Sequence, residues 1–222
     1  MKHAILLDID GTLVDSNDLH AESWRVVLDQ FGYRVSFDKL RGMIGMGSDK
    51  LLPAAAGLSS ESPRGAEIVA ARSELFMKEY LPRVRALPGA RKLVERILDR
   101  GHQPVVATSA NERELEGLLS RGNLSDLLRV RTTSDDAAAS KPDPHIVQAA
   151  LRAAHAQPRE AIMVGDTPYD LQAAARAGVR FVGVRTGGYD DHALRGALAV
   201  YRDAEELYDQ FDDSPLAARP KG

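Results

Sequence analysis

The chain contains 222 residues, of which 44% are hydrophobic and 27% are charged, proportions that are ordinary for a globular protein with a buried core. The formal net charge of −3 argues against a protein built to coat nucleic acid or an anionic membrane. Because the sequence contains no cysteine, it excludes disulfides, cysteine-ligated zinc, iron–sulfur clusters and thiol catalysis.

Five short apolar segments predict buried strands, and helical patterns alternate with them. The strands are expected at residues 3–8, 103–108, 128–132, 161–165 and 180–185, with a weaker sixth candidate at 198–201. Most lack polar alternation, which is typical of strands covered on both faces. Helices are expected at residues 90–100, 112–120, 144–154 and 170–177. The alternation predicts an α/β fold with a Rossmann-like, doubly wound parallel sheet.

Residues 17–81 interrupt this alternation, because they carry helical signals at 19–31, 38–44, 49–56 and 65–80 and no convincing strand. The insertion lies between the first two strands, so it leaves and rejoins the sheet at the edge where open α/β sheets bind ligands. We expect a core domain of residues 1–15 and 84–222 and a helical domain of residues 16–83 that covers the site. Residues 213–222 are polar and are expected to form a mobile tail.

The strongest chemical signal follows the first predicted strand, where Asp8, Asp10 and Gly11 open the string DIDGTLVDS at residues 8–16. Gly11 permits a tight turn, so that two carboxylates can face one crevice. Such a pair favours a hard cation such as Mg²⁺, which binds oxygen ligands. An isolated Asp-x-Asp-Gly can also be an ordinary turn, but the longer string makes this alternative weaker.

Three further groups follow later strands, and each also has a simpler structural interpretation. Thr108 and Ser109 can hold an anion at a helix N-terminus, or they can merely cap that helix. Lys141 can offset the charge of a phosphate, or it can be a solvated surface lysine. Asp166 and Asp170, within VGDTPYD at residues 164–170, add two carboxylates or a helix cap. Their convergence on one sheet edge is more informative than any of them alone.

With these residues in this order, the sequence resembles the haloacid dehalogenase superfamily of phosphotransferases. The resemblance runs from Lys2 to about Leu207 and includes all four family motifs, of which DIDGTLVDS and VGDTPYD are highly specific. It implies a sheet order of 3-2-1-4-5 with the Asp8 strand in the centre. It also implies that the helical insertion is a cap of the C1 type.

The resemblance further implies a role for each matching residue. Asp8 is similar to the nucleophile that forms an aspartyl-phosphate, and Asp10 is similar to the general acid–base. Asp8, Asp166 and the backbone carbonyl of Asp10 would hold Mg²⁺, with Asp170 in support. Thr108 and Lys141 would hold phosphate oxygens. Further candidates for contact with the substrate are Gly11, Ser109, Ala110 and Asn111 in the core and His20 and Arg72 in the cap.

The choice between a phosphatase and a β-phosphoglucomutase depends on the cap. His20 and Trp24 resemble the first cap helix of mutases and of related sugar-phosphate phosphatases, although helix packing explains their spacing equally well. Mutases grip a distal phosphate with a cap arginine, but here Asp49 stands in that place and Lys50 is one position off. Arg72 is a candidate for the crevice, with a solvated surface arginine as the simpler interpretation.

We therefore predict a Mg²⁺-dependent phosphatase that acts on a small phosphomonoester, either a sugar phosphate or a phosphoglycolate-like acid, with a phosphomutase as the alternative. A dehalogenase is disfavoured because Asp10 is present, and a receiver domain is disfavoured by the length and the helical insertion. The expected partner is the small-molecule substrate, without nucleic acid or membrane. With no long apolar run in the sequence, we expect a cytoplasmic protein, monomeric by default with a dimer left open.

Overall fold

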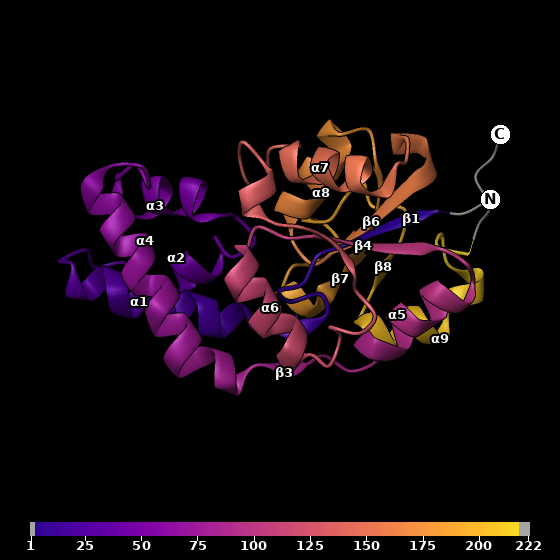
Figure 1. Ribbon diagram of the computed structural model, residues 1–222, viewed down its shortest axis with the longest axis horizontal. Coiled ribbons are helices and arrows are strands. Elements are labelled where there is room, and N and C mark those ends of the chain that lie inside the picture. The colour runs from indigo at the N-terminus through magenta and orange to yellow at the C-terminus, as the bar shows by residue number, and fades with distance from the viewer. Residues whose placement is uncertain (1–2, 218–222) are drawn as a thin grey trace.

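The computed structural model describes residues 3–217, and its centre is a six-stranded sheet (Figure 1). The sheet order is β5-β4-β1-β6-β7-β8, and every neighbouring pair of strands is parallel. The predicted order, with the Asp8 strand in the centre, is confirmed, and the weak sixth candidate is the edge strand β8. The strands are β1 (Ala4–Leu7), β4 (Gln103–Ala107), β5 (Val130–Thr132), β6 (Ala161–Gly165), β7 (Arg180–Val184) and β8 (Val200–Tyr201).

Helices cover both faces of the sheet, which explains why its central strands are largely apolar. Ile5 and Leu7 of β1 pack in one cluster with α5 (Ala90–Asp99), α6 (Glu112–Arg121) and α9 (Ala204–Asp209). Ala4 and Leu6 point the other way and pack with α7 (His145–Ala154) and α8 (Pro168–Arg176). The period of two along β1 therefore divides the core into two layers. Helix α9 is an addition that the sequence analysis does not predict.

The helices inserted after β1 form a separate lobe beside the sheet (Figure 1). This lobe has its own apolar cluster, which includes Trp24, Leu52 and Ile68. Local sequence sets the helix ends: Ser62 caps the N-terminus of α4, and Pro63 occupies its first turn. The predicted helix at 65–80 is α4 followed by a π-helical turn, Phe76–Tyr80. The helices are α1 (Asn17–Gln30), α2 (Phe37–Arg41), α3 (Ser48–Ala56) and α4 (Pro63–Leu75).

A short antiparallel ribbon lies where the chain enters and leaves this lobe. It pairs β2 (Val14–Asp15) with β3 (Arg85–Ala86). Strands of two residues carry no periodic signal, so the sequence analysis does not predict them. The ribbon holds the two connections side by side at the sheet edge that bears Asp8.

The C-terminal segment corrects one expectation. The predicted mobile tail begins at residue 213, but Ser214 and Leu216 are buried, and Leu216 belongs to the same cluster as Ile5. Residues 218–222 of that predicted tail lie outside the described residues. Within the described part of this segment, Leu216 is a buried apolar anchor that the polar composition does not reveal.

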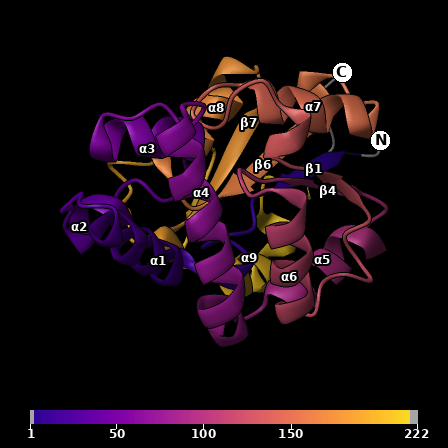
Figure 2. The ribbon, with the colours of Figure 1, turned by 60° about the vertical axis from the view of Figure 1, so that its left-hand side comes forward.

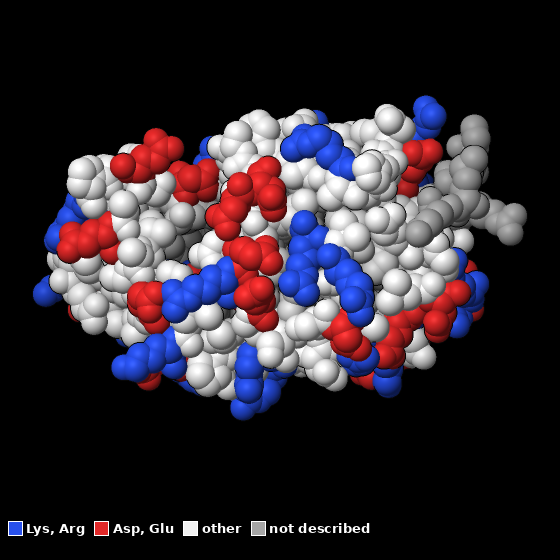
Figure 3. Space-filling model, viewed as in Figure 1, with Lys and Arg blue, Asp and Glu red and all other residues white. Residues whose placement is uncertain are grey.

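Two observations bear on the predicted lack of membrane and nucleic-acid partners. Within residues 3–217, no helix combines the length and the apolar character needed to cross a membrane. On the face shown in Figure 3, Lys and Arg side chains lie among Asp and Glu side chains rather than in one continuous basic surface.

The C-terminal anchor can be tested by two matched truncations of leucine. Leu216→Ala should lower the free energy of unfolding by about 2–5 kcal/mol, because Leu216 is fully buried and its removal leaves a cavity. Leu198→Ala is the control, since Leu198 is 49% exposed, and it should change stability by less than about 0.5 kcal/mol. Urea unfolding measures both variants. Equal stability of Leu216→Ala and the wild type would mean that this segment is not packed in solution.

Candidate active site

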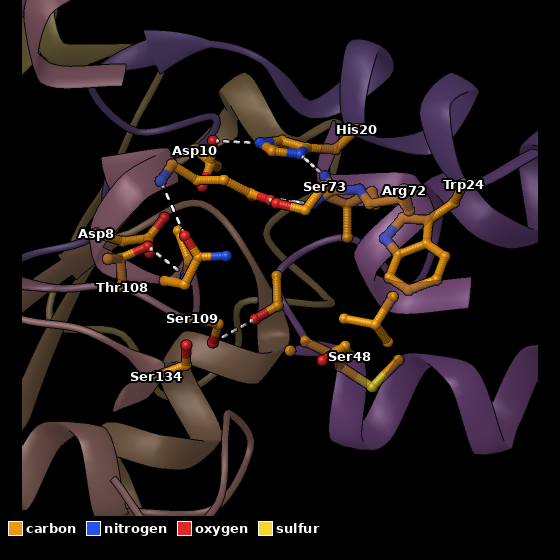
Figure 4. Close-up of a pocket in the computed structure, with 18 residues that line it drawn as sticks. Asp8, Asp10, His20, Trp24, Ser48, Arg72, Ser73, Thr108, Ser109 and Ser134 are labelled. Atoms are coloured by element: carbon orange, nitrogen blue, oxygen red, sulfur yellow. Dashed lines mark hydrogen bonds and ion pairs between the residues drawn. The ribbon is translucent and has the colours of Figure 1, made fainter. Parts of the chain in front are cut away.

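The groups predicted from separate parts of the sequence meet at the edge where the parallel strands end. Asp8 directly follows β1, Thr108 follows β4 and Asp166 follows β6. Figure 4 shows Asp8 and Thr108 on the core side, with His20 and Arg72 on the helical lobe opposite them. These four side chains line opposite sides of a pocket of ≈ 100 Å³. The site is therefore shared between the sheet edge and the inserted helices.

Lys141 is the positive centre of the core side, although its side chain is only 1% exposed. Its Nζ donates a hydrogen bond to Oδ1 of Asp8 and lies 2.7 Å from Oδ1 of Asp170. Burial alone would lower the pKa of Lys141, but the charges of Asp170 and Asp8 outweigh burial and raise it. The lysine stays protonated inside the protein, so its interpretation as a solvated surface residue is wrong.

Three buried carboxylates form a candidate metal centre. Asp8, Asp166 and Asp170 offer oxygen atoms that all lie within 4.8 Å of one another. Burial raises the pKa of Asp8 to about 7. The positive charge of Lys141 lowers this pKa, but burial and the repulsion from neighbouring carboxylates outweigh it. The same causes raise the pKa of Asp166 well above its usual value. One lysine does not balance three buried carboxylates, and a hard divalent cation fits the excess of negative oxygen ligands.

Thr12 and Asn17 complete this centre, and the sequence analysis did not single them out. Thr12 donates to Oδ1 of Asp166 at 3.2 Å, and Asn17 donates to its Oδ2 at 2.8 Å. Oδ1 of Asn17 is buried without a hydrogen-bond partner among the described residues, so it adds a further oxygen that suits a cation or its water. The string that begins at Asp8 could have drawn attention to both, because they lie within it or directly after it.

Gly11 serves this packing rather than the pocket, whose lining among the described residues does not include it. Its φ is +75°, and a Cβ there would lie 2.0 Å from Nδ2 of Asn17 and 2.1 Å from Oδ2 of Asp166. Only glycine fits this approach. The expectation that Gly11 contacts the substrate has no support in this geometry.

Asp10 is not part of the cluster of three carboxylates, and its side chain points toward His20 of the helical lobe (Figure 4). Its Oδ1 accepts a hydrogen bond from the Ser16 hydroxyl and lies 2.8 Å from Nε2 of His20. Although burial opposes the shift, His20, Ser16 and Arg72 lower the pKa of Asp10. Its side chain is therefore not a metal ligand in this arrangement, and the expected metal contact depends on its backbone carbonyl alone.

The tautomer of His20 follows from its two partners. Nη2 of Arg72 approaches Nδ1 of His20, and a guanidinium can only donate. Nδ1 must therefore accept a hydrogen bond, so Nε2 carries the ring proton and donates a hydrogen bond to Asp10. The ring also stacks on Phe76 at 4.0 Å between centroids. His20 thus packs against Phe76 and contacts Asp10, and it also lines the pocket, as its expected contact with the substrate requires.

Arg72 lines the pocket, as a candidate for the crevice should, and its burial corrects the simpler interpretation of a solvated surface arginine. Its Nη1 donates to both carboxylate oxygens of Glu114 at 2.9 Å, and its Nε donates to Ser23 at 3.1 Å. The side chains of Arg72 and Glu114 are 9% and 4% exposed. The pair joins α4 to α6, which lie side by side in Figures 1 and 2. Sequence reasoning missed Glu114, because an acid in a first helical turn is usually explained by the helix dipole.

The helix after β4 is capped differently from the simple interpretation of its sequence. Asn111, not Thr108 or Ser109, is the N-cap of α6, because its side chain accepts a backbone N–H of the first turn. The Thr108 hydroxyl accepts from the Ala110 N–H at 3.1 Å, and the Ser109 hydroxyl donates to the Gly45 carbonyl at 3.3 Å. Ser109, Ala110 and Asn111 all line the pocket, as their expected contact with substrate requires.

Two charged residues at the start of α3 are bound to the core. Asp49 accepts the Ser140 N–H at 3.1 Å, and Lys50 lies 2.7 Å from Asp143 in an ion pair. Asp170 is similarly engaged, since it forms a capping box with Thr167 at the start of α8 besides its contact with Lys141. The helix-cap interpretation of Asp170 is therefore confirmed, and the residue also belongs to the cluster of three buried carboxylates.

Comparison with known proteins agrees with this geometry. The family model for haloacid dehalogenase-like hydrolases matches residues 5–184. The phosphoglycolate phosphatase of Rhodospirillum rubrum is 32% identical over 226 residues, which cover 94% of this chain and 90% of that protein.

Solved structures with this architecture include both hydrolases and mutase-like proteins. A hydrolase from Pseudomonas syringae is 27% identical, with a TM-score of 0.86 over 96% of this chain and 99% of that one. A protein from Bacteroides vulgatus provisionally named β-phosphoglucomutase is 25% identical, with a TM-score of 0.85 over 100% of this chain and 91% of that one. The predicted resemblance is confirmed: the chain belongs to the haloacid dehalogenase-like hydrolases and is an enzyme of the phosphatase type.

Proposed function

We propose that the protein is a Mg²⁺-dependent phosphomonoester hydrolase that acts on a small phosphorylated metabolite through an aspartyl-phosphate on Asp8. The observation that carries the proposal is the unlike placement of two neighbouring carboxylates. Asp8 is held by Lys141 at the metal centre, whereas Asp10 is held by His20 at the opposite side of the pocket. Unlike environments are typical of a nucleophile paired with a separate proton carrier.

The first step would form one bond and break another. An Oδ atom of Asp8 attacks phosphorus while the ester P–O bond breaks, and Asp10 gives its proton to the departing alcohol oxygen. In the second step water attacks the phosphorus of the aspartyl-phosphate, its proton returns to Asp10, and the Asp8–phosphorus bond breaks. The net products are the free alcohol and inorganic phosphate.

Charge balance accounts for the other core residues. Two unit charges about 4 Å apart repel by about 4 kcal/mol at an effective dielectric constant of about 20, so a carboxylate does not approach a phosphate unaided. Lys141 offsets this repulsion, and the Thr108 hydroxyl offers a hydrogen bond to a phosphoryl oxygen. Asp8, Asp166 and Asp170, with the Asp10 carbonyl, would hold Mg²⁺. The bound ion would supply electrostatic stabilisation of the transferring phosphoryl group.

Asp10 needs a proton before it can act as an acid. In the protein without substrate, its partners keep its pKa low, so it is ionised. A bound phosphate is a second anion beside it, and a nearby like charge raises the pKa of a carboxyl group. Substrate binding is therefore expected to protonate Asp10 when the proton is needed.

Turnover by Asp8→Asn tests the nucleophile. We expect release of phosphate to fall by at least about 1,000-fold, because an amide cannot form the acyl-phosphate. The assay is phosphate release with Mg²⁺ from a panel of phosphoglycolate, hexose and pentose phosphates, nucleoside monophosphates and β-glucose 1-phosphate. The exposed carboxylate of Asp29 provides a control, and Asp29→Asn should remain active.

The same panel separates the hydrolase from the mutase alternative. Conversion of β-glucose 1-phosphate to glucose 6-phosphate with little release of phosphate would support a mutase instead. Undiminished phosphate release by purified, folded Asp8→Asn protein would contradict the nucleophile.

The metal centre makes the stability of the metal-free protein depend on pH. The pKa values of Asp8 and Asp166 are raised on folding, so the folded protein binds more protons than the unfolded chain. The stabilising contribution of Asp8 is full below about pH 4 and is lost as the pH rises through about 7, and that of Asp166 is likewise lost as the pH rises. Asp166→Asn removes one carboxylate, so at pH 7 it should melt about 2–4 °C above the wild type in EDTA.

Calorimetry checks this prediction. The difference in Tm should shrink toward pH 4, where the wild-type carboxyl groups are protonated. Mg²⁺ should raise the Tm of the wild type and of Asp29→Asn, but not that of Asp166→Asn. An equal Tm for the variant and the wild type in EDTA, with the response to Mg²⁺ retained in both, would count against the centre.

A further inference from the structure

The part of the pocket away from Asp8 has one apolar wall and holds one cationic side chain among the described residues. Trp24, Ile44 and Val69 of the helical lobe line it, and Arg72 is the arginine that reaches it. Figure 4 shows Trp24 and Arg72 on the side opposite Asp8, where the group that leaves the phosphate would lie. The charge state of Arg72 and its neighbours therefore decides which leaving groups this part accepts.

Arg72 is fully engaged by the protein. Each of its three guanidinium nitrogens has a partner: Nη1 donates to Glu114, Nε donates to Ser23 and Nη2 faces Nδ1 of His20. Its guanidinium also lies over the rings of Trp24 and Phe76, at 5.4 and 4.8 Å from their centroids. An anionic leaving group would have to displace these partners before it could bind the guanidinium.

Glu114 makes that displacement unfavourable. Its two oxygens accept from Arg72, and one also accepts from the Ser73 hydroxyl at 2.8 Å. Although burial opposes the shift, Arg72, His20 and Ser73 lower the pKa of Glu114, so it carries a full negative charge. Separation of the pair would leave a carboxylate buried without its partner, which is strongly unfavourable.

The two nearby lysines do not supply the positive charge that Arg72 lacks for binding an anionic leaving group. Lys141 lies at the phosphoryl end between Asp8 and Asp170, and Lys50 is paired with Asp143 outside the lining of the pocket. Within residues 3–217, the leaving-group side therefore combines an apolar wall with a neutralised ion pair. The cavity of ≈ 100 Å³ is also small beside the roughly 300–1,000 Å³ of typical ligand pockets.

We infer that the enzyme takes small phosphomonoesters whose leaving group is an uncharged alcohol, and that Glu114 sets this preference by neutralising Arg72. A leaving group that carries a carboxylate, as in phosphoglycolate, or a second phosphate has no unpaired positive charge to bind. It is also repelled by the negative charge of Glu114. This inference rests on the proposed hydrolase function and narrows its substrate class. It assigns Glu114 as a specificity-determining residue on the core side of the pocket.

Two substrates that differ mainly in charge test the inference in the wild type. Phosphoglycolate carries a carboxylate, and 2-hydroxyethyl phosphate carries a hydroxyl in nearly the same position. With Mg²⁺, we expect kcat/KM to be at least about tenfold higher for the neutral ester. A preference for phosphoglycolate would overturn the inference and leave the hydrolase intact. No phosphate release from any ester in the panel would overturn both.

Glu114→Gln then tests the residue. The amide keeps the size and one acceptor of the side chain but leaves the Arg72 charge available, so the KM for phosphoglycolate should fall. The ratio of kcat/KM for phosphoglycolate to that for the neutral ester should rise about tenfold or more. Glu116→Gln removes the same charge from an exposed position of α6 and should leave the ratio at its wild-type value.

A double variant tests whether the freed Arg72 guanidinium, rather than an indirect structural effect, causes the change in the ratio. Arg72→Met with Glu114→Gln removes both charges, so the ratio should return to or below the wild-type value if the freed guanidinium causes the gain. A purely structural role of Glu114 would lower kcat/KM for both esters alike and leave the ratio unmoved, which would overturn the assignment. If Glu114→Gln does not fold, the comparison of the two esters in the wild type still decides the substrate class.

Discussion

The whole site depends on a single electrostatic constraint, which is the concentration of buried carboxylates at the end of a parallel sheet. Asp8, Asp166 and Asp170 lie close together, and the buried Lys141 supplies only one compensating charge. Such an arrangement stores unfavourable energy in the metal-free protein. A divalent cation and a phosphoryl group, one positive and one negative, are the ligands that such a centre can accommodate together.

The helical lobe contributes a second group of connected charged and polar side chains, opposite the carboxylates of the core. His20, Arg72 and Glu114 form a chain from Asp10 across the lobe and back to α6 of the core. The chain holds Asp10 apart from the metal centre and cancels the arginine charge that faces the leaving group. In the proposed mechanism the two groups of side chains have separate roles: the core would bind the phosphoryl group, and the lobe would select the group attached to it.

The sheet order and the residues of the core side were predictable because local rules carry them. Apolar runs without alternation predict strands covered on both faces, and parallel strands bring their following residues to one edge. Asp8, Thr108 and Asp166 come together for that reason, and Lys141 reaches Asp8 from the loop after β5. Features without a clear periodic pattern were not predicted from the sequence. They are the ribbon of β2 and β3, helix α9 and the buried Leu216.

By itself, the sequence determined the fold class, the family and the core residues that meet at the sheet edge, since strand order and motif spacing follow from local pattern. Only the tertiary structure decided which partner each buried charged side chain has. Arg72 and Glu114 are 42 residues apart, and nothing in either neighbourhood indicates that they pair. The partner of a buried charge is chosen by the packing of α4 against α6, and that packing depends on side-chain contacts between segments far apart in the chain.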